Sequence, residues 1–365
     1  MGAARVGRRE RRVGIEHADP DPALRLERVH IGRELESRTG RRRPRGRRRR
    51  GRRGRLRDAA RERDRGEGER ETAARDSVAV PHATSVGRAS AVTLANVSEL
   101  FAPVRERLST LPGEAAAYVC DPSGRELFSE RADEPFPAAS VIKLPLVMAI
   151  FADAARGRVD LDERVAVGER VDGSGVLRHM RDVEPLSLRD LAMLAVIVSD
   201  NTATNRLIDR IGVERVNERL REWGCPNTRL ARRMYDFAAA ERGAENLMTA
   251  RETASLLVRL IRGECEDRAT SEAVMALLAE CQDRTMLRRY LPNAADVANK
   301  TGTLDESRND AAIVRGEPTV VVAAFTRKLR DTEAAVSWLG VLGWCAYRAA
   351  GNAGGALPPE LVRSA

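Results

Sequence analysis

The pattern of hydrophobic positions divides the chain beyond residue 90 into two kinds of segment. Short runs that alternate between hydrophobic and polar residues, bounded by turn residues, are typical of strands. Runs in which hydrophobic residues recur every three or four positions are typical of helices. The predicted strands are residues 115–120, 125–131, 296–303, 310–314 and 319–326. The predicted helices are residues 140–155, 188–198, 202–211, 213–223, 249–262, 271–279 and 331–349.

The order of these segments predicts an α/β fold of the α+β type. Two strands come first, a long helical block follows, and three strands and a last helix close the chain. Because a sheet and its helices must bury their hydrophobic sides against each other, the simplest arrangement is one antiparallel five-stranded sheet flanked by helices. The helical block is then an inserted all-helical lobe, and the groove between sheet and lobe is where we expect a site.

Charge sets the first 90 residues apart from the rest of the chain. Residues 1–90 hold 27 Arg against 14 Asp and Glu, a net of +13, and they contain no Phe, Trp or Tyr. Residues 91–365 hold 36 Lys and Arg against 40 Asp and Glu, a net of −4. The first segment cannot bury enough hydrophobic surface to offset chain entropy, which predicts an Arg-rich disordered tail or a mis-called start. We expect one domain over 91–365, with a sheet lobe (91–140 and 290–365) and a helical lobe (141–289).

The basic run at residues 41–50 is of a kind that binds phosphates. Without aromatic residues for base stacking, or zinc-ligand or helix-turn-helix spacing, a nucleic-acid partner is not expected.

No hydrophobic run is long enough to span a membrane, and residues 13–17 are not a signal-peptide core, so a cytoplasmic monomer is expected, or an exported one if the start is wrong. Five cysteines without a Cys-x-x-Cys pair predict free thiols.

Lysine is the rarest basic residue in this chain, and its positions are informative. The chain has 63 Lys and Arg together, of which only Lys143, Lys300 and Lys328 are lysines. Arginine stays charged at any working pH, whereas a buried lysine can lose its proton and act as a base. Lys143 and Lys300 both belong to short motifs, so we expect the chemistry there, whereas Lys328 matches no motif.

Ser140-Val141-Ile142-Lys143 lies at the predicted start of a helix. Residues three apart are neighbours on one helix face, so the lysine amine can reach the serine hydroxyl. A serine hydroxyl is a weak nucleophile that needs an adjacent base, and burial or a nearby cation lets lysine serve. The alternative interpretation is a helix cap beside a solvated lysine. His179 is the only histidine after residue 90, so a Ser-His-Asp triad would have to use it.

Two further motifs carry polar groups suited to the same chemistry. Ser199-Asp200-Asn201 follows a predicted buried helix, and it offers a second hydroxyl and a side-chain amide. The alternative interpretation is that these residues only cap the polar end of a helix. Lys300-Thr301-Gly302-Thr303 lies on a predicted strand, where a glycine lets a ligand or another backbone approach closely. Lys300 could attract a carboxylate and lower the pKa of Lys143; the alternative is an edge strand ending in a turn.

Together and in this order, the three motifs resemble the set found in class A β-lactamases and penicillin-binding proteins. The likeness runs from about Gly113 to Ala349 and is closest to the class A β-lactamases. It implies that Ser140 is acylated, that Lys143 is its base partner, and that Ser199 relays a proton to the leaving nitrogen. The implied substrate-binding residues are Asn201, Lys300, Thr301, Gly302 and Thr303. The implied oxyanion hole is formed by the backbone N–H groups of Ser140 and Thr303, Arg308 could add a carboxylate contact, and no metal or cofactor is implied.

The sequence departs from the family pattern at one important position. Class A enzymes carry a glutamate, followed four residues later by asparagine, that activates the deacylating water. Counting from Arg229-Leu230 places Met234 where that glutamate belongs. Asp236 is the best substitute, ahead of Glu241 and Glu245, although none has the asparagine.

Three functions stay open on these grounds. The first is a serine hydrolase that is acylated by a β-lactam or a related amide or ester and then hydrolyses the acyl-enzyme. The second is a penicillin-binding D-alanyl peptidase or esterase that turns lactams over slowly because the glutamate is missing. The third, from another class, is a nucleic-acid-associated protein that uses the basic tail and keeps a relic hydrolase domain.

Overall fold

The computed structural model describes residues 99–355 and 358–362, which fall within one compact unit, Ala83–Ala365. The prediction of a disordered tail over residues 1–90 lies outside the described residues. Within them, no helix is both long and apolar enough to cross a bilayer.

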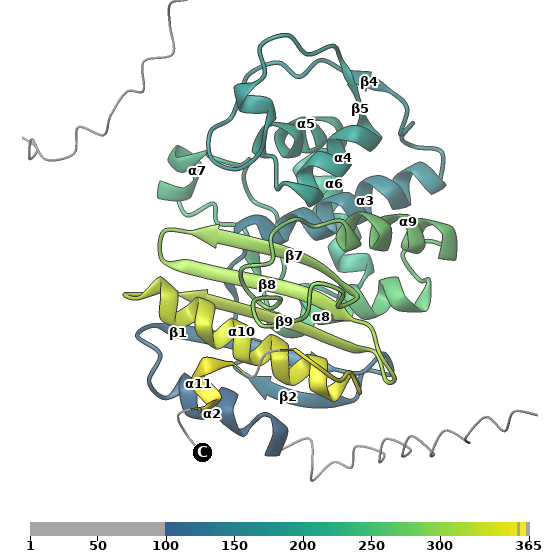
Figure 1. Cartoon of the computed structure of the whole chain (residues 1–365). Helices are drawn as coiled ribbons and strands as arrows, with labels where there is room; N and C mark the ends of the chain where they lie inside the picture. Colours follow the sequence, from purple (N-terminus) through teal and green to yellow (C-terminus); the bar gives the residue numbers. More distant parts are fainter. Residues whose placement is uncertain (1–98, 356–357, 363–365) are drawn as a thin grey trace, which may run out of the picture. The chain divides into compact units, whose positions relative to one another are not determined.

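Five strands form one antiparallel sheet in the order β2-β1-β9-β8-β7 (Figure 1). The strands are β1 (Glu114–Cys120), β2 (Glu126–Glu130), β7 (Val297–Leu304), β8 (Ser307–Val314) and β9 (Val320–Arg327). β1 pairs directly with β9, so the two ends of the domain share one sheet. This confirms the antiparallel five-stranded sheet predicted from the hydrophobic pattern, and it makes β7 an edge strand.

Side chains alternate across the sheet, and each face buries its own hydrophobic cluster. On β1, Ala116 and Tyr118 join one cluster while Ala117 and Val119 join the other. Helices α10 (Thr332–Ala349) and α2 (Ala102–Leu108) pack together on one side, whereas α8 (Ala250–Arg262) contacts β1, β8 and β9 on the other. Figure 1 shows α10 lying across the sheet and most of the remaining helices beyond β7.

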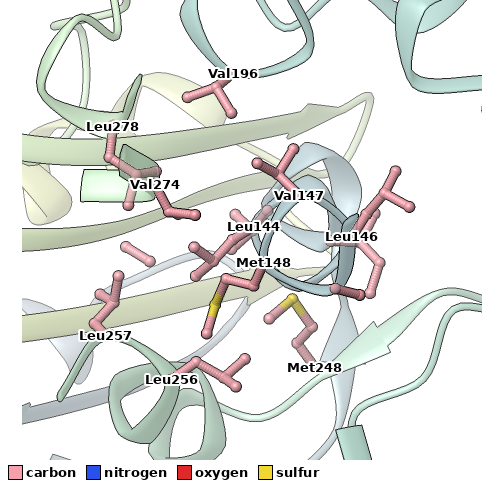
Figure 2. Close-up of a cluster of buried hydrophobic side chains, with 14 of the residues drawn as sticks. Leu144, Leu146, Val147, Met148, Val196, Met248, Leu256, Leu257, Val274 and Leu278 are labelled. Carbon is pink, nitrogen blue, oxygen red and sulfur yellow. The ribbon is translucent and has the colours of Figure 1, made fainter. Parts of the chain in front are cut away.

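Helix α3 (Lys143–Ala155) lies at the centre of the larger cluster, and most of its side chains are buried. Figure 2 shows Leu144 and Met148 pointing towards Leu256 and Leu257 of α8. The helices around it are α4 (Leu188–Ile197), α5 (Asn201–Ile211), α6 (Val213–Glu222) and α9 (Arg268–Ala279). A helix buried on all sides is held rigidly, so the residues at its N-terminus have a fixed position.

The helix boundaries follow from side-chain caps that the sequence supplies. Ser187, Asp200, Thr249, Asp267 and Asp331 each accept a hydrogen bond from a backbone N–H in the first turn of α4, α5, α8, α9 and α10, in that order. Such caps satisfy donors that have no partner inside the helix and typically stabilise it by about 1 kcal/mol. Asp200 is also the middle residue of Ser-Asp-Asn, so this motif is a helix start.

Several short elements were not predicted. They are α2, η2 (Ala139–Ile142), η3 (Leu177–His179), α7 (Phe237–Glu241), α11 (Pro359–Val362), and the two-residue strands β3 (Phe136–Pro137), β4 (Arg164–Val165), β5 (Leu186–Ser187) and β6 (Leu247–Met248). The strands form two small sheets, β3 with β6 and β4 with β5, beside the helical block. Elements this short show no periodicity: two residues of a strand span only one alternation, and the short helical elements span two turns or fewer.

Candidate active site

Ser140 lies on η2, a 3₁₀ turn that leads directly into α3, so the predicted helix starts three residues later, at Lys143. The preceding residue, Ala139, has φ of +48°, which L-residues other than glycine rarely adopt. Backbone strain of this kind persists only where the surroundings enforce it. The next residue, Ser140, has its side chain half-buried at the wall of a cavity.

Gly302 on β7 explains how the strand comes so close to this serine. A methyl group placed on Gly302 would lie 2.9 Å from Ala139 Cβ and 3.0 Å from the Ser140 backbone nitrogen. Any side chain here would push β7 away from η2. The glycine of Lys-Thr-Gly is therefore required by the close packing of the two motifs.

Lys143 is fully buried, and its ammonium has three acceptors. Its Nζ donates to Ser199 O at 2.7 Å, Ser199 Oγ at 3.1 Å and Asn201 Oδ1 at 2.8 Å. Within the described residues, these acceptors do not include the Ser140 hydroxyl, which the spacing led us to expect. Burial, and secondly the charge of Lys300, lower the pKa of Lys143 well below its usual value, against the opposing effect of Asp200.

Ser199 stands between the two lysines. Its hydroxyl oxygen is 3.1 Å from Lys143 Nζ and 3.1 Å from Lys300 Nζ. The residue lies between α4 and α5 with φ of +54°, again a strained backbone for a serine. A hydroxyl held between two amines is well placed to pass a proton from one side to the other.

Lys300 is also fully buried, and it donates to Ser199 Oγ and to Thr301 O at 2.8 Å. Burial lowers its pKa, while the charges of Cys281, Asp310 and Asp283 act against that shift. The predicted effect of Lys300 on Lys143 is confirmed in direction, because the Lys300 charge lowers the Lys143 pKa.

Asp200 anchors the neighbouring segment, a role that the sequence analysis missed. Its carboxylate accepts from Val176 N at 2.7 Å, Leu177 N at 2.8 Å and Ala203 N at 2.9 Å. Gly175 leaves the necessary room, since a methyl group there would collide with the Asp200 carboxyl. The position of this acid inside Ser-Asp-Asn was the available signal.

Asn201 uses its side-chain amide inside the protein. The Oδ1 atom accepts from Lys143, and the Nδ2 atom donates to Asp172 O at 2.8 Å. The residue is buried and does not line the cavity. In this structure it holds Lys143 in place, and its contact with a substrate amide stays a prediction.

A cavity of about 350 Å³ joins the three motifs. Its lining residues are Ser140, Ser174, Val196, Ile197, Val198, Ser199, Cys281, Gln282, Asp283, Lys300, Thr301, Gly302 and Thr303. The structure thus brings Ser140, Ser199 and the Lys300–Thr303 strand together around one cavity. Lys143 is buried and does not line this cavity. Sequence reasoning did not predict the walls at Ser174, 196–198 and 281–283.

The loop that should supply a water-activating acid carries a buried hydrophobic residue at that position. Met234 is buried in the larger hydrophobic cluster, and Asn205 clamps its backbone with hydrogen bonds of 2.8 and 3.1 Å. Asp236 caps α7 by accepting from Ala239 N, Glu245 pairs with Arg232, and neither lines the cavity. Glu241, the last residue of α7, is also absent from the lining.

Arg308 lies on β8 directly opposite Thr303 of β7, and its guanidinium donates to the carbonyls of Leu304 and Ser307. Its contact with a substrate carboxylate stays a prediction. His179 is exposed and accepts from its neighbour Arg178, away from the cavity. The five cysteines are free, as the sequence predicted, and they are also buried. Among residues 99–355 and 358–362, no three His, Cys, Asp or Glu side chains gather as a metal-ion site.

The fold and the cluster define a class of protein with an antiparallel sheet, a helical insertion and a serine–lysine site between them. The family model of the beta-lactamase enzyme family matches residues 99–350, and the chain belongs to that family. The β-lactamase BRO-1 of Moraxella catarrhalis is 29% identical over 199 residues, covering 53% of this chain and 63% of that protein. The chain thus spans less than two thirds of that relative's length.

Solved structures show the same fold. A β-lactamase from Sphaerobacter thermophilus is 30% identical with a TM-score of 0.63, covering 70% of this chain and 97% of that one. An ancestral class A β-lactamase is 26% identical with a TM-score of 0.63, covering 68% and 99%. PBP-A is 26% identical with a TM-score of 0.62, covering 69% and 96%. A variant of PBP-A has been solved as an acyl-enzyme complex with penicillin G.

Proposed function

We propose that this protein is a serine β-lactamase-like hydrolase in which Ser140 is acylated by a β-lactam and the acyl-enzyme is then hydrolysed slowly. The observation that carries the proposal is the Ser199 hydroxyl, held 3.1 Å from both Lys143 and Lys300 at the wall of the cavity that contains Ser140. Membership of the β-lactamase enzyme family supports this function over the peptidase and nucleic-acid alternatives.

Acylation requires a base that reaches the Ser140 hydroxyl, and Lys143, three residues along the chain, fits that role once its amine turns from Ser199 and Asn201 towards Ser140. Its lowered pKa makes the neutral amine accessible, and a neutral amine can accept a proton. The Ser140 oxygen attacks the lactam carbonyl carbon, and its proton passes to Lys143 Nζ. The carbonyl oxygen becomes an oxyanion, and the C–N bond then breaks. Ser199 passes a proton from the lysine to the leaving nitrogen, which gives a Ser140 ester and a free amine.

The remaining groups of the cavity suit the rest of a β-lactam. The backbone N–H groups of Ser140 and Thr303 form the oxyanion hole, an arrangement that contributes several kcal/mol in acyl transfer. Lys300 and Thr301 bind the substrate carboxylate, because both line the cavity and Lys300 supplies its positive charge. Gly302 lets β7 pack against η2, which brings Thr301 and Thr303 next to Ser140.

Deacylation needs a water that adds to the ester carbonyl and returns the Ser140 proton as the C–O bond breaks. A positioned general base contributes about 10²- to 10⁴-fold to such a step. Met234 offers no base, and Asp236 uses its carboxylate to cap α7. We therefore propose that deacylation limits turnover. The acyl-enzyme complex of a PBP-A variant with penicillin G supports the formation of such an ester in this fold.

Opening of the lactam ring of penicillin G, followed by ultraviolet absorbance, tests this function. The wild-type protein is expected to open about one equivalent rapidly and further equivalents slowly, and Ser140→Ala is expected to open none. Ser123→Ala is the matched control, because Ser123 is an exposed turn serine bonded to Asp121. Ring opening by Ser140→Ala at the wild-type rate would contradict the proposal.

Other sequence predictions belong to this proposal and rest on the sequence alone. They are the division into a sheet lobe (91–140 and 290–365) and a helical lobe (141–289), a monomer, a cytoplasmic location, and chemistry without a metal or cofactor.

A further inference from the structure

Two aromatic rings are exposed on the loop that follows Met234. Tyr235 is 45% exposed and Phe237 is 58% exposed. Their ring centroids are 5.1 Å apart in an edge-to-face arrangement. Aromatic pairs of this kind usually bury much of their surface in a core or an interface. Here the pair presents it to solvent.

The backbone holds Tyr235 in a conformation that it would not adopt by itself. Its φ is +63°, in the left-handed region that is an outlier for a bulky residue. Asn205 clamps Met234 on one side, and Asp236 caps α7 on the other. Strain at an exposed residue has no explanation in core packing, and strained residues cluster at functional sites.

The Tyr235 ring lies against the rim of the active-site cavity. A methyl group placed on Gly173 would be 2.5 Å from Tyr235 Cε2 and 2.6 Å from its hydroxyl oxygen, so the ring covers this glycine. The next residue, Ser174, lines the cavity together with Ser140 and Ser199. The Tyr235 ring therefore covers the residue next to the cavity lining, and the Phe237 ring packs against Tyr235.

This part of the wall is fixed to the catalytic motifs. Asn201 N donates to Ser174 O at 3.1 Å, and the Asp200 carboxylate holds the following residues through Val176 N and Leu177 N. Gly173 itself has φ of +85°, which glycine adopts without strain. Tyr235 is thus held at a set place relative to Ser199 rather than on a freely moving loop.

We propose that Tyr235 and Phe237 are specificity-determining residues that bind an uncharged, aromatic or aliphatic acyl side chain of the substrate. This inference rests on the proposed function, since it concerns the same cavity. Aromatic rings provide a large apolar surface at little cost in conformational entropy, and they pair favourably with another ring. The loop that lacks an acid at Met234 thereby supplies an apolar contact instead.

Two β-lactams with the same ring system but different side chains test this inference. Penicillin G carries a phenylacetyl side chain, and 6-aminopenicillanic acid carries none. The double variant Tyr235→Asn, Phe237→Ala removes both rings, and asparagine tolerates the left-handed backbone at residue 235. Its second-order rate of acylation by penicillin G is expected to fall about 10- to 100-fold, the range for losing apolar contacts in a pocket. Acylation by 6-aminopenicillanic acid is expected to change less than about twofold.

The matched control is Met193→Ala, which removes an exposed hydrophobic side chain of α4 that does not line the cavity. It is expected to leave both rates unchanged, and Tyr235→Phe is expected to keep the preference for penicillin G. An equal fall with both compounds, or no fall with either, would overturn the inference and leave the proposed function intact. A wild-type protein that neither compound acylates would overturn both.

Discussion

The two halves of the proposed reaction depend on regions of very different composition. Beside Ser140, hydrogen bonds of 2.7 to 3.1 Å join Lys143 of α3, Ser199 between α4 and α5, and Lys300 of β7. The loop that includes Met234 turns a hydrophobic side chain into the core at the place where an acid is expected. If the proposed reaction takes place, the difference means that acylation and deacylation depend on separate segments of the chain.

The largest expected effect is that of Lys143→Arg on acylation. Guanidinium stays protonated and cannot accept the Ser140 proton, so the rate of adduct formation with penicillin G should fall about 10²- to 10⁴-fold. Stopped-flow kinetics or quenched mass spectrometry measures this rate. Lys328→Arg is the control, because Lys328 is 71% exposed and pairs with Glu114. Acylation by Lys143→Arg at the wild-type rate would show that Lys143 is not the base.

A carboxylate at residue 234 should make deacylation faster, and so bring its rate closer to that of acylation. The Met234 side chain is packed in the hydrophobic cluster, where a charged carboxylate is disfavoured, so in Met234→Glu the new side chain is expected to turn out of the cluster towards the cavity. As a general base there, in the position that the family uses, it is expected to raise the deacylation rate by about 10²-fold. Met234→Gln has the same length without the base and should deacylate like the wild type. The measurement is the decay of the acyl-enzyme after excess penicillin G is removed. Equal decay rates in the two variants would contradict the interpretation of Met234.

The charge of Lys300 should set the pH at which acylation becomes fast. Acylation rises with pH as Lys143 loses its proton, and the Lys300 charge lowers the Lys143 pKa. Lys300→Ala removes that charge, so the rising part of the pH–rate profile should move to higher pH, and acylation near neutral pH should fall about tenfold for each pKa unit. Lys300→Arg should move it less, and Lys328→Ala not at all. An unmoved profile in Lys300→Ala would rule out this coupling.

The smallest effect is expected at Asp236, which the sequence analysis proposed as a substitute water activator. Asparagine also caps helices, so Asp236→Asn keeps the bond to Ala239 N and removes only the charge. We expect deacylation to change by less than about twofold, whereas Asp236→Ala should lower the free energy of unfolding by about 1 kcal/mol. A large fall in deacylation in Asp236→Asn alone would restore the substitute role.

The sequence predicted most of the framework and six of the thirteen residues that line the cavity. The five strands and the long helices followed from periodicity, and Lys143 and Lys300 followed from their rarity and their motifs. It did not predict the strained backbones at Ala139 and Ser199, because tertiary packing enforces them against local preference.

Contacts between distant segments could not be read from spacing. The ammonium of Lys143 bonds Ser199 and Asn201, more than fifty positions away, rather than the serine three residues before it. The ring of Tyr235 covers Gly173 for the same reason, since the fold brings the two loops together. Asp200 was visible in its motif, yet its three backbone donors became apparent only in the folded chain.

The most direct test is intact-protein mass spectrometry of the wild-type chain mixed with penicillin G and sampled from milliseconds to hours. We expect a mass increase equal to one penicillin G molecule to appear rapidly, to map to Ser140 after digestion, and to disappear slowly while the opened acid accumulates. An acid product that accumulates without a detectable adduct would contradict slow deacylation. An absence of both adduct and product would contradict the assignment of Ser140 as the acylated residue.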